Sequence, residues 1–404
     1  MTLELEKLTK DIETMARGAY QRRQEENALL EQLLEKLREH RTAWQKIDRA
    51  MTTAINTVDM KWYRGACPLG DREPLDAAIP APPPPPSATL VACDGSQIIP
   101  NRHGAYLYSV INVGIIVYYH GEGCAPLQDT RPTLDYPGNG EDGDAFVDKA
   151  ALVSLRRDLA EIETLVETAG EYQDSDQPVL ALLDQRLLYW PVGSSGEEEG
   201  QRVLFGWQQA MSQSCEDECM LAGYIDRPGK RSVLTFLNTL DINRPGFDTA
   251  RLIRPDYGPG FNDVTLFRRL LTEPGQRSAV FIDVSQHNTE FARRDQNNEV
   301  CFFYLNPSPR GRQIARVDIP RWVAEDPQKV ELVHALVYNQ CQIMGDYPYV
   351  LARADELAVV GYRDKESLDI MIENAMQRYG LAARPTAKQG SKNVARAGRT
   401  RHGM

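Results

Sequence analysis

Two acidic residues close apolar stretches that are typical of buried β-strands. Asp94 ends "LVACD" and Asp184 ends "LALLD". A carboxylate in such a place costs free energy unless a partner compensates its charge. One explanation is a hairpin turn, which Asp-Gly dipeptides favour, since Asp94 precedes a glycine. The other is a divalent cation, bound by carboxylates that neighbouring strands bring to one edge of a sheet.

A third carboxylate is predicted on the intervening helix. Residues 147–169 have an apolar stripe at spacings of three and four, formed by Leu152, Leu155, Leu159, Ile162 and Val166. Glu161 and Glu163 flank this stripe on opposite sides, so either could lean toward the sheet edge. Hard divalent cations prefer carboxylate oxygens, and they can activate water for hydrolysis of a phosphodiester.

The elements that position these acids alternate between strands and helices. Apolar runs predict strands at 88–94, 105–120, 178–184, 279–284 and 301–306. Residues 327–344 and 364–379 have the periodicity of helices. Strands that precede and follow a helix indicate an α/β fold built on a mixed sheet.

A helical N-terminal region precedes these strands. Residues 3–60 read as long helix, with Leu30, Leu37, Trp44 and Met51 recurring every seven residues. This pattern is typical of a coiled coil or a helical hairpin, packed on its own domain or on a dimer partner. The proline-rich stretch "PAPPPPP" that follows should be a stiff, extended spacer.

The chain therefore divides into four predicted parts. A basic tail closes the sequence, and six Lys or Arg residues without an acid predict that it is disordered, either solvated or in weak contact with phosphates. The parts are an N-terminal helical region (1–79), a Pro-rich linker (80–87), a main domain (88–380) and the tail (381–404).

Composition excludes several classes of protein. The 404 residues are 42% hydrophobic and 25% charged, which is ordinary for a globular protein, and no apolar run is long enough to span a membrane. Seven cysteines at irregular spacing predict a reducing cytoplasmic location, and Cys215 and Cys219 have no second pair at zinc-site spacing. A net charge of −11 does not suggest nucleic-acid binding, although a local basic groove would permit it.

Six segments, in order, resemble the NurA nucleases, prokaryotic enzymes that process DNA ends with the hexameric translocase HerA. They span most of residues 88–360 and read "VACDGSQ", "RDLAEIETL", "LALLDQRL", "AGYIDRP", "ARVDIPRW" and "DYPYVLARADELAVV". The resemblance implies metal-binding roles for Asp94, Asp184 and a helical Glu. An Arg four residues earlier favours Glu161 over Glu163 for that third role.

Two positions depart from the family pattern. The family usually has Gly after the second Asp, where this chain has Gln185. The family also places a metal-binding His within "RAHE", where this chain reads "RADE" with Asp355. Asp is itself a good ligand for Mg²⁺ or Mn²⁺, so the change would keep the site with an added negative charge. It would equally fit a site that has decayed.

The resemblance implies a ribonuclease-H-like fold, a homodimer, and 5′-to-3′ exonuclease and single-strand endonuclease activity that depends on manganese. Arg157 and Arg186 lie near the acids and could clamp phosphate or serve as salt-bridge residues. Tyr224 and Tyr347 could stack on bases or pack in the core. The alternative to an enzyme is a non-catalytic adaptor that docks on a translocase through its N-terminal helices.

Overall fold

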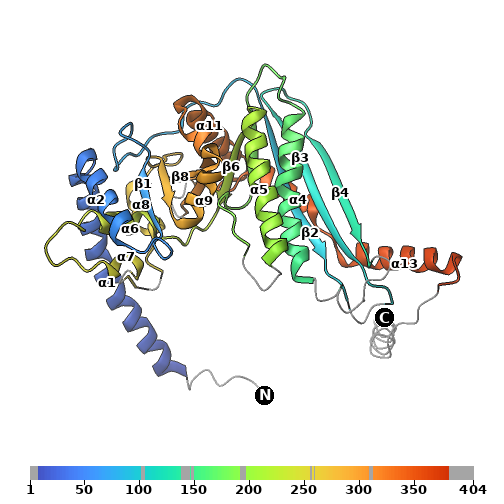
Figure 1. The fold of residues 1–404 in the computed structure, drawn as a ribbon, viewed down its shortest axis with the longest axis horizontal. Coiled ribbons are helices and arrows are strands. Elements are labelled where there is room, and N and C mark those ends of the chain that lie inside the picture. The colour runs from blue at the N-terminus through green and yellow to red at the C-terminus, as the bar shows by residue number, and fades with distance from the viewer. Residues whose placement is uncertain are drawn as a thin grey trace. The chain divides into compact units, whose positions relative to one another are not determined.

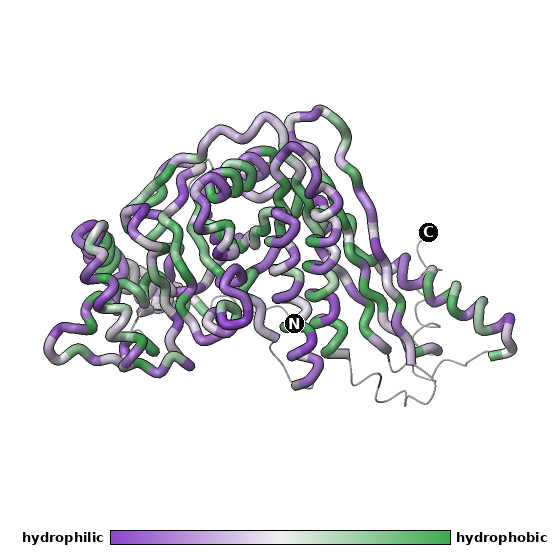
Figure 2. The backbone as a smooth tube through the Cα atoms, turned by 45° about the horizontal axis from the view of Figure 1, so that its top comes forward, coloured by the Kyte–Doolittle hydropathy of each residue, from purple (hydrophilic) through white to green (hydrophobic). Residues whose placement is uncertain are grey.

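The chain folds into two compact units. The structure is a computed structural model that describes residues 8–101, 105–137, 146, 150–191, 197–254, 257–258, 260–308 and 313–381. Unit 1 comprises Met1–Pro85, Gln185–Leu188 and Leu221–Tyr349. Unit 2 comprises Pro86–Asp184, Tyr189–Met220 and Val350–Met404. Each unit is a mixed α/β structure, as the sequence predicts, with hydrophobic residues concentrated in its strands (Figure 2).

Unit 2 contains a meander of three antiparallel strands and a fourth strand parallel to the first. The strands are β2 (Ala88–Ile98), β3 (Ser109–His120), β4 (Leu127–Asp135) and β5 (Val179–Leu183), in the order β5-β2-β3-β4. β2 pairs with β3 antiparallel and with β5 parallel. A helix, α4 (Ala150–Gly170), connects β4 to β5. This succession is the ribonuclease-H-like arrangement that the sequence predicts.

Helices pack on the strands of unit 2. α4 and α5 (Glu197–Glu216) lie side by side, and α4 covers β2 (Figure 1). The first six residues of β2 are all buried, since a strand in a helix-covered sheet needs an apolar run rather than an alternating one. Two further helices follow late in the chain, α12 (Tyr349–Ala358) and α13 (Tyr362–Arg378).

Unit 1 has five strands, each antiparallel to its neighbours. Their order is β1-β7-β8-β9-β6. They are β1 (Gly65–Pro68), β6 (Met220–Ile225), β7 (Phe281–Val284), β8 (Val300–Leu305) and β9 (Ala315–Pro320). The helices of this unit and one 3₁₀ turn are α1 (Thr9–Glu39), α2 (Trp44–Thr57), α6 (Ser232–Thr239), α7 (Ala250–Ile253), α8 (Asp263–Leu270), α9 (Gln286–Arg294), η2 (Gln296–Asn298), α10 (Arg321–Ala324) and α11 (Pro327–Met344).

The N-terminal region forms two helices rather than one, because a turn at residues 40–43 separates α1 from α2. The heptad stripe crosses this break, so the described residues contain no continuous coiled coil. Leu30, Leu37 and Met51 are buried in one hydrophobic core with residues of α6, α8 and β7. The apolar stripe therefore packs on its own unit.

The structure describes the predicted linker but not the basic residues of the predicted tail. Residues 80–87 form neither helix nor strand; the isolated bridge of Ile79 with Arg277 comes just before them, and the boundary between the two units falls at Pro85 and Pro86. The basic residues of the predicted tail lie outside the described residues. Among the described residues, no helix is long and apolar enough to cross a membrane.

Candidate metal centre

Asp94 and Asp184 occupy adjacent positions on two neighbouring strands, but only Asp184 follows a strand end: β2 continues through Asp94 and Gly95 to Ile98, so the predicted strand end and the Asp-Gly turn at this position are wrong. Cys93 of β2 pairs with Leu183 of β5 in parallel register, and each acid is the next residue. Two parallel strands place successive residues at one edge, so the two carboxylates come from adjacent positions. Asp94 is half-buried, whereas Asp184, just after β5, is exposed.

Glu161 reaches this edge from helix α4. A Cβ atom added to Gly95 would lie 2.5 Å from Glu161 Oε1 and 2.8 Å from Arg157 Cγ. Glu161 thus occupies the space that a side chain at position 95 would fill, and only 5% of its surface is exposed. The helix can approach β2 this closely because residue 95 is glycine.

Asp355 is brought to Asp94 by a second glycine. Gly114 of β3 is the cross-strand partner of Asp94, so both residues face the same side of the sheet. A Cβ atom on Gly114 would lie 2.4 Å from Ala358 N and 2.7 Å from Ala354 O, so the backbone of α12 rests directly on β3. On this helix, Asp355 forms a hydrogen bond with the Asp94 carboxyl group.

Polar side chains of β2 and β3 fix the end of α12. Ser96 Oγ donates to Ala358 O, and Asn112 Nδ2 donates to the same oxygen at 2.9 Å. The backbone N–H of Val360 in turn donates to Ser96 Oγ at 3.1 Å. These bonds satisfy the carbonyl groups that a helix leaves unpaired at its C-terminus. They also fix the position of Asp355 relative to β2.

The strand pleat divides these acids between two faces. Successive residues of a strand point to opposite sides, so Asp94 faces α12 while Gly95 faces α4. Asp94 and Asp355 therefore meet on one side of the sheet. Glu161 approaches from the other side, at the edge where β5 has already ended.

Burial and neighbouring acids raise the pKa of Glu161 and of Asp94. Burial raises the pKa of Glu161 to about 9, and the charges of Asp94, Asp158 and Asp184 contribute in the same direction against the lowering effect of Arg157. Burial also raises the pKa of Asp94, and Asp355 adds to this effect through its hydrogen bond and its charge. Burial and the neighbouring acids therefore both favour the protonated forms of Glu161 and Asp94.

Arg157 is a structural counter-charge to Glu161. Arg157 Nε lies 3.1 Å from Glu161 Oε1, one helical turn away, and Nη2 donates to Asp158 at 2.6 Å. Tyr189 also donates a hydrogen bond to Asp158, at 3.0 Å. Of the two roles considered from the sequence, the structure shows the salt bridge.

The chemistry of these side chains fits a hard divalent cation, although they do not form a closed coordination shell. All four donors are carboxyl groups, which are the ligands that hard divalent cations prefer. Yet within the described part of the chain, no three His, Cys, Asp or Glu side chains form a group that could hold a metal ion. Binding would therefore require the side chains to turn toward one another from the two faces of the sheet.

Other residues singled out from the sequence lie elsewhere. Glu163 is exposed on α4, which separates it from the buried position of Glu161. Arg186 and Gln185 belong to the short segment grouped with unit 1, where Arg186 is exposed. Tyr224 is fully buried in unit 1, its ring meeting Tyr347 edge to face at 5.5 Å. Base stacking by Tyr224 is therefore wrong, because the β6 strand is part of the core; Tyr347 is half-buried.

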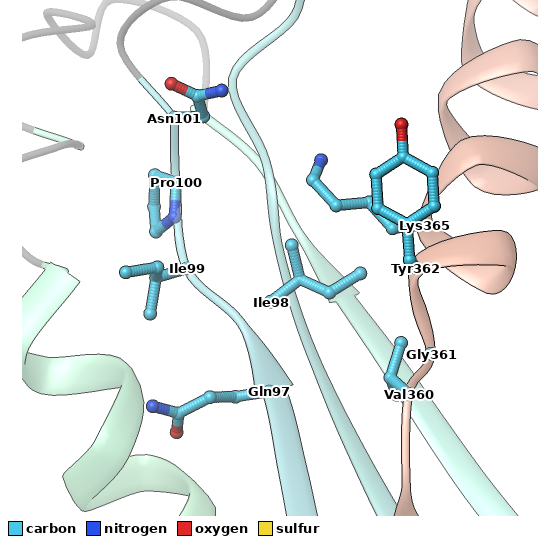
Figure 3. A pocket seen from close by; sticks show the side chains of 9 residues that line it. All are labelled: Gln97, Ile98, Ile99, Pro100, Asn101, Val360, Gly361, Tyr362 and Lys365. Carbon is cyan, nitrogen blue, oxygen red and sulfur yellow. The ribbon is translucent and has the colours of Figure 1, made fainter. Parts of the chain in front are cut away.

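Unit 2 also contains a groove of about 450 Å³, whose lining includes none of the four acids. Figure 3 shows its two walls, formed by the end of β2 and by the segment that leads from α12 into α13. Ile98, Ile99 and Pro100 give one wall its apolar surface, while Tyr362 and Lys365 belong to the other. These walls extend the two chain segments that carry Asp94 and Asp355.

Several of these contacts have no signal in the sequence. Gly95 and Gly114 decide how closely two helices approach, and Asp158 holds Arg157. A glycine within a strand indicates a close approach of other backbone, but it does not name the partner. Ala358, for example, is 244 residues from Gly114 along the chain.

Solved structures of nucleases resemble this chain at low sequence identity. The NurA nuclease from Sulfolobus solfataricus superposes with a TM-score of 0.47 at 16% identity, covering 85% of this chain and 96% of that one. Ciona intestinalis endonuclease V with inosine-containing DNA gives 0.31 at 10% identity, covering 70% and 86%. The catalytic domain of human endonuclease V gives 0.27 at 10%, covering 73% and 84%.

The family follows from the sequence match rather than from these superpositions. No curated protein matches the chain. A NurA domain, however, matches residues 88–360, a segment that contains Asp94, Glu161, Asp184 and Asp355. Because this domain accounts for more than half of the chain, the protein belongs to the NurA family.

Proposed function

We propose that this protein is a divalent-metal-dependent DNA nuclease. The proposal rests on one observation: in a NurA domain, carboxyl groups from β2, α4, the end of β5 and α12 lie near one another around Asp94. Burial and the charges of Asp94, Asp158 and Asp184 raise the pKa of Glu161. Neighbouring acids with perturbed pKa values favour a functional site over a structural ion pair.

Asp94, Glu161, Asp184 and Asp355 are the residues that would hold Mn²⁺, or Mg²⁺ in its place. The chemistry supplied by such a cation is activation of water and stabilisation of the negative charge that develops on the phosphate. The raised pKa values of Asp94 and Glu161 mean that metal binding would displace protons, so metal affinity should rise with pH.

Arg157 is a positioning residue in this proposal. Its guanidinium holds the Glu161 carboxylate by the 3.1 Å ion pair, while Asp158 and Tyr189 hold the guanidinium. This chain of contacts keeps Glu161 oriented toward the sheet edge. Arg157 is about one third exposed, so part of the guanidinium also remains open to a phosphate.

The groove in unit 2 suits a single DNA strand. Tyr362 is 65% exposed at its mouth and offers a ring on which a base can stack. The Ile98 side chain points toward the wall with Tyr362 and Lys365 and would contact the sugar or base (Figure 3). The Lys365 ammonium group contacts Tyr108 and Asp369.

The finer activity follows from the family. We propose 5′-to-3′ exonuclease and single-strand endonuclease activity, a homodimer, and action with a HerA-type ATPase in DNA end processing. Repeated cleavage along one strand requires the DNA to move past the site, which a hexameric translocase would supply. Two copies of the chain would offer one site to each strand of a duplex.

The experiment is release of soluble nucleotides from end-labelled linear DNA by the purified full-length protein, with Mn²⁺, Mg²⁺ or EDTA. We expect cleavage with Mn²⁺ that EDTA abolishes. Labelling either the 5′ or the 3′ end separates the two polarities, and a circular single strand separates endonuclease from exonuclease activity. No cleavage of any of these substrates, with or without a HerA-type ATPase, would contradict the proposal.

A second candidate function is that of a non-catalytic adaptor that docks on a translocase. Two observations favour it: the described carboxylates do not form a closed metal site, and Asp355 stands where the family typically has His. An adaptor would bind the ATPase and stimulate it without cleaving DNA. ATP hydrolysis that rises with this protein, together with intact DNA in Mn²⁺, would support this candidate.

A further inference from the structure

Unit 1 contains a groove of about 780 Å³ whose charged residues are all cations. It lies between the start of α2 and the segment that follows α6. Lys46, Arg49 and Arg244 line it, and no acidic residue does. The chain as a whole carries a net charge of −11, so a groove lined by three cations is contrary to its average composition.

Lys46 is held in this groove by a neutral acceptor. His40 is 5% exposed, and its Nδ1 lies 3.0 Å from Lys36 O, so this nitrogen carries the proton and donates. The other ring nitrogen, Nε2, then accepts from Lys46 Nζ at 2.6 Å. The imidazole fixes the position of the ammonium group without cancelling its charge. Lys46 therefore keeps two N–H donors and a full positive charge for another ligand.

Asn243 and Arg244, from the segment that follows α6, also line the groove. Thr53 Oγ1 lies 3.1 Å from Asn243 Oδ1 and donates to it, which leaves the Asn243 amide N–H groups available. Arg244 uses Nε for Asp241 at 3.0 Å, and its side chain is 67% exposed. Asp241 is shared with Lys36, so its charge is divided between two cations.

Arg49 completes the set on the same helix. It follows Lys46 by three residues on α2, and residues at this spacing lie on one face. Asp48 lies between them in the sequence but does not line the groove. Trp44, at the first position of α2, adds an aromatic surface to the lining.

We propose that this groove binds the phosphate backbone of DNA, as a second DNA contact in addition to the carboxylate site. The ligand follows from the lining: cations and N–H donors without acids select an anion with many acceptor oxygens, and closely spaced cations select one with repeated charges. The identification of that polyanion as DNA rests on the proposed function. Contacts of this kind bind without regard to base sequence.

The experiment measures binding of a labelled oligonucleotide by fluorescence anisotropy across a series of salt concentrations. The background is the full-length Asp94→Ala variant, so that cleavage does not interfere. The test variant adds Lys46→Gln, Arg49→Gln and Arg244→Gln. The matched control adds Arg251→Gln, Arg268→Gln and Arg293→Gln, which removes the same charge from exposed positions of unit 1 outside the groove.

We expect the groove variant to bind DNA at least about tenfold more weakly, with a salt slope shallower by about 2 to 3, because each lost phosphate contact removes roughly 0.7 to 0.9. The control should change affinity less than about threefold. Equal losses in both variants, or none in the groove variant, would overturn the proposal. Weaker binding by the groove variant alone, in a protein whose Asp94-intact form cleaves nothing, would keep the groove and reject the nuclease.

Discussion

Two groups of acids in this chain have opposite relations to their cations. In unit 1, Arg316 bridges two aspartates: its Nη2 lies 3.0 Å from Asp283 and its Nε 2.6 Å from Asp318. Lys230 adds a second contact to Asp283 at 2.9 Å. In unit 2, the Arg157 guanidinium contacts Asp158 at 2.6 Å and Glu161 at 3.1 Å, and the charges of Asp94 and Asp184 also act on Glu161.

The pKa of Asp283 in unit 1 is lowered, whereas the pKa of Glu161 in unit 2 is raised. Burial alone would raise the pKa of Asp283, but Lys230 and Arg316 outweigh it and hold the pKa below its ordinary value. At Glu161 burial wins, and neighbouring acids raise the pKa further. Burial therefore does not decide whether an acid is structural. The balance of nearby charge decides, and an excess of acid indicates a group that awaits an external cation.

The largest expected effect is the loss of cleavage in Asp94→Ala or Asp184→Ala. Each change removes a charged ligand, so we expect activity in Mn²⁺ to fall on the order of a thousandfold. Circular dichroism and thermal unfolding should show an intact fold, because Asp94 is only half-buried and Asp184 is exposed. Folded variants that cleave DNA at the wild-type rate would break the comparison, because the unbalanced acids would then have no catalytic role.

Arg316→Met tests the balanced group. It leaves Asp283 and Asp318 buried without their shared counter-charge, and we expect a loss of roughly 3–5 kcal/mol in the free energy of unfolding, measured with urea. The deficit should shrink toward low pH, where the two carboxyls can take up protons. Arg269→Met, in an exposed pair with Glu31, is the control and should cost less than about 1 kcal/mol. Similar losses in both variants would show that burial of the pair is unimportant.

Glu161→Gln should separate stability from activity. The folded state holds a proton on Glu161 up to about pH 9, whereas the unfolded chain releases it near its ordinary pKa of 4.5. The contribution of this group to stability is therefore full at low pH. It falls as pH rises through this window, by at most about 1.4 kcal/mol per pH unit.

The Gln variant should lack that decline and be more stable than wild type at pH 8, while losing far more activity than Glu163→Gln. The measurements are urea unfolding at several pH values in EDTA, and cleavage at pH 8 in Mn²⁺. A wild-type protein whose stability does not fall with pH would contradict the raised pKa. A reversed ranking of activity would assign the site to Glu163.

The smallest effect is expected at Asp355. Asp355→Ala removes one charge and the hydrogen bond to Asp94, and we expect roughly tenfold lower cleavage that extra Mn²⁺ partly restores. Asp355→His should give a stricter preference for Mn²⁺ over Mg²⁺, since the site then contains a nitrogen donor. Cleavage titrated against each metal provides the measurement. Unchanged metal dependence in both variants would make Asp355 a bystander.

The sequence predicted the features that depend on a local pattern of residues. The apolar run before Asp184 correctly placed that acid at a strand end, whereas β2 continues past Asp94 to Ile98; parallel pairing of β2 with β5 still puts the two acids at adjacent positions. The helix between them also followed from its stripe. Choosing Glu161 over Glu163 required the family resemblance, because periodicity alone left both at the margins of the buried face.

Other elements had no local signal. β4 is exposed along its length and contains Pro132, as edge strands can, so it lacks both an apolar run and alternation. The ion pairs of Arg316 join residues of β7 and β9, and the α12 backbone contacts a strand formed more than 200 residues earlier. Such contacts depend on topology, which periodicity cannot supply.

The contact of α12 with Gly114 has a consequence for how the protein tolerates change. The position of Asp355 is set by main chain resting on main chain, not by the shapes of packed side chains. Hydrophobic residues of the surrounding core can therefore drift over generations while the carboxylate stays in place. Gly114 itself cannot change, because even a methyl group at 2.4 Å from a backbone nitrogen would lift the helix away from β3. A search for distant relatives or a redesign of this unit should accordingly hold that glycine fixed and leave the core free.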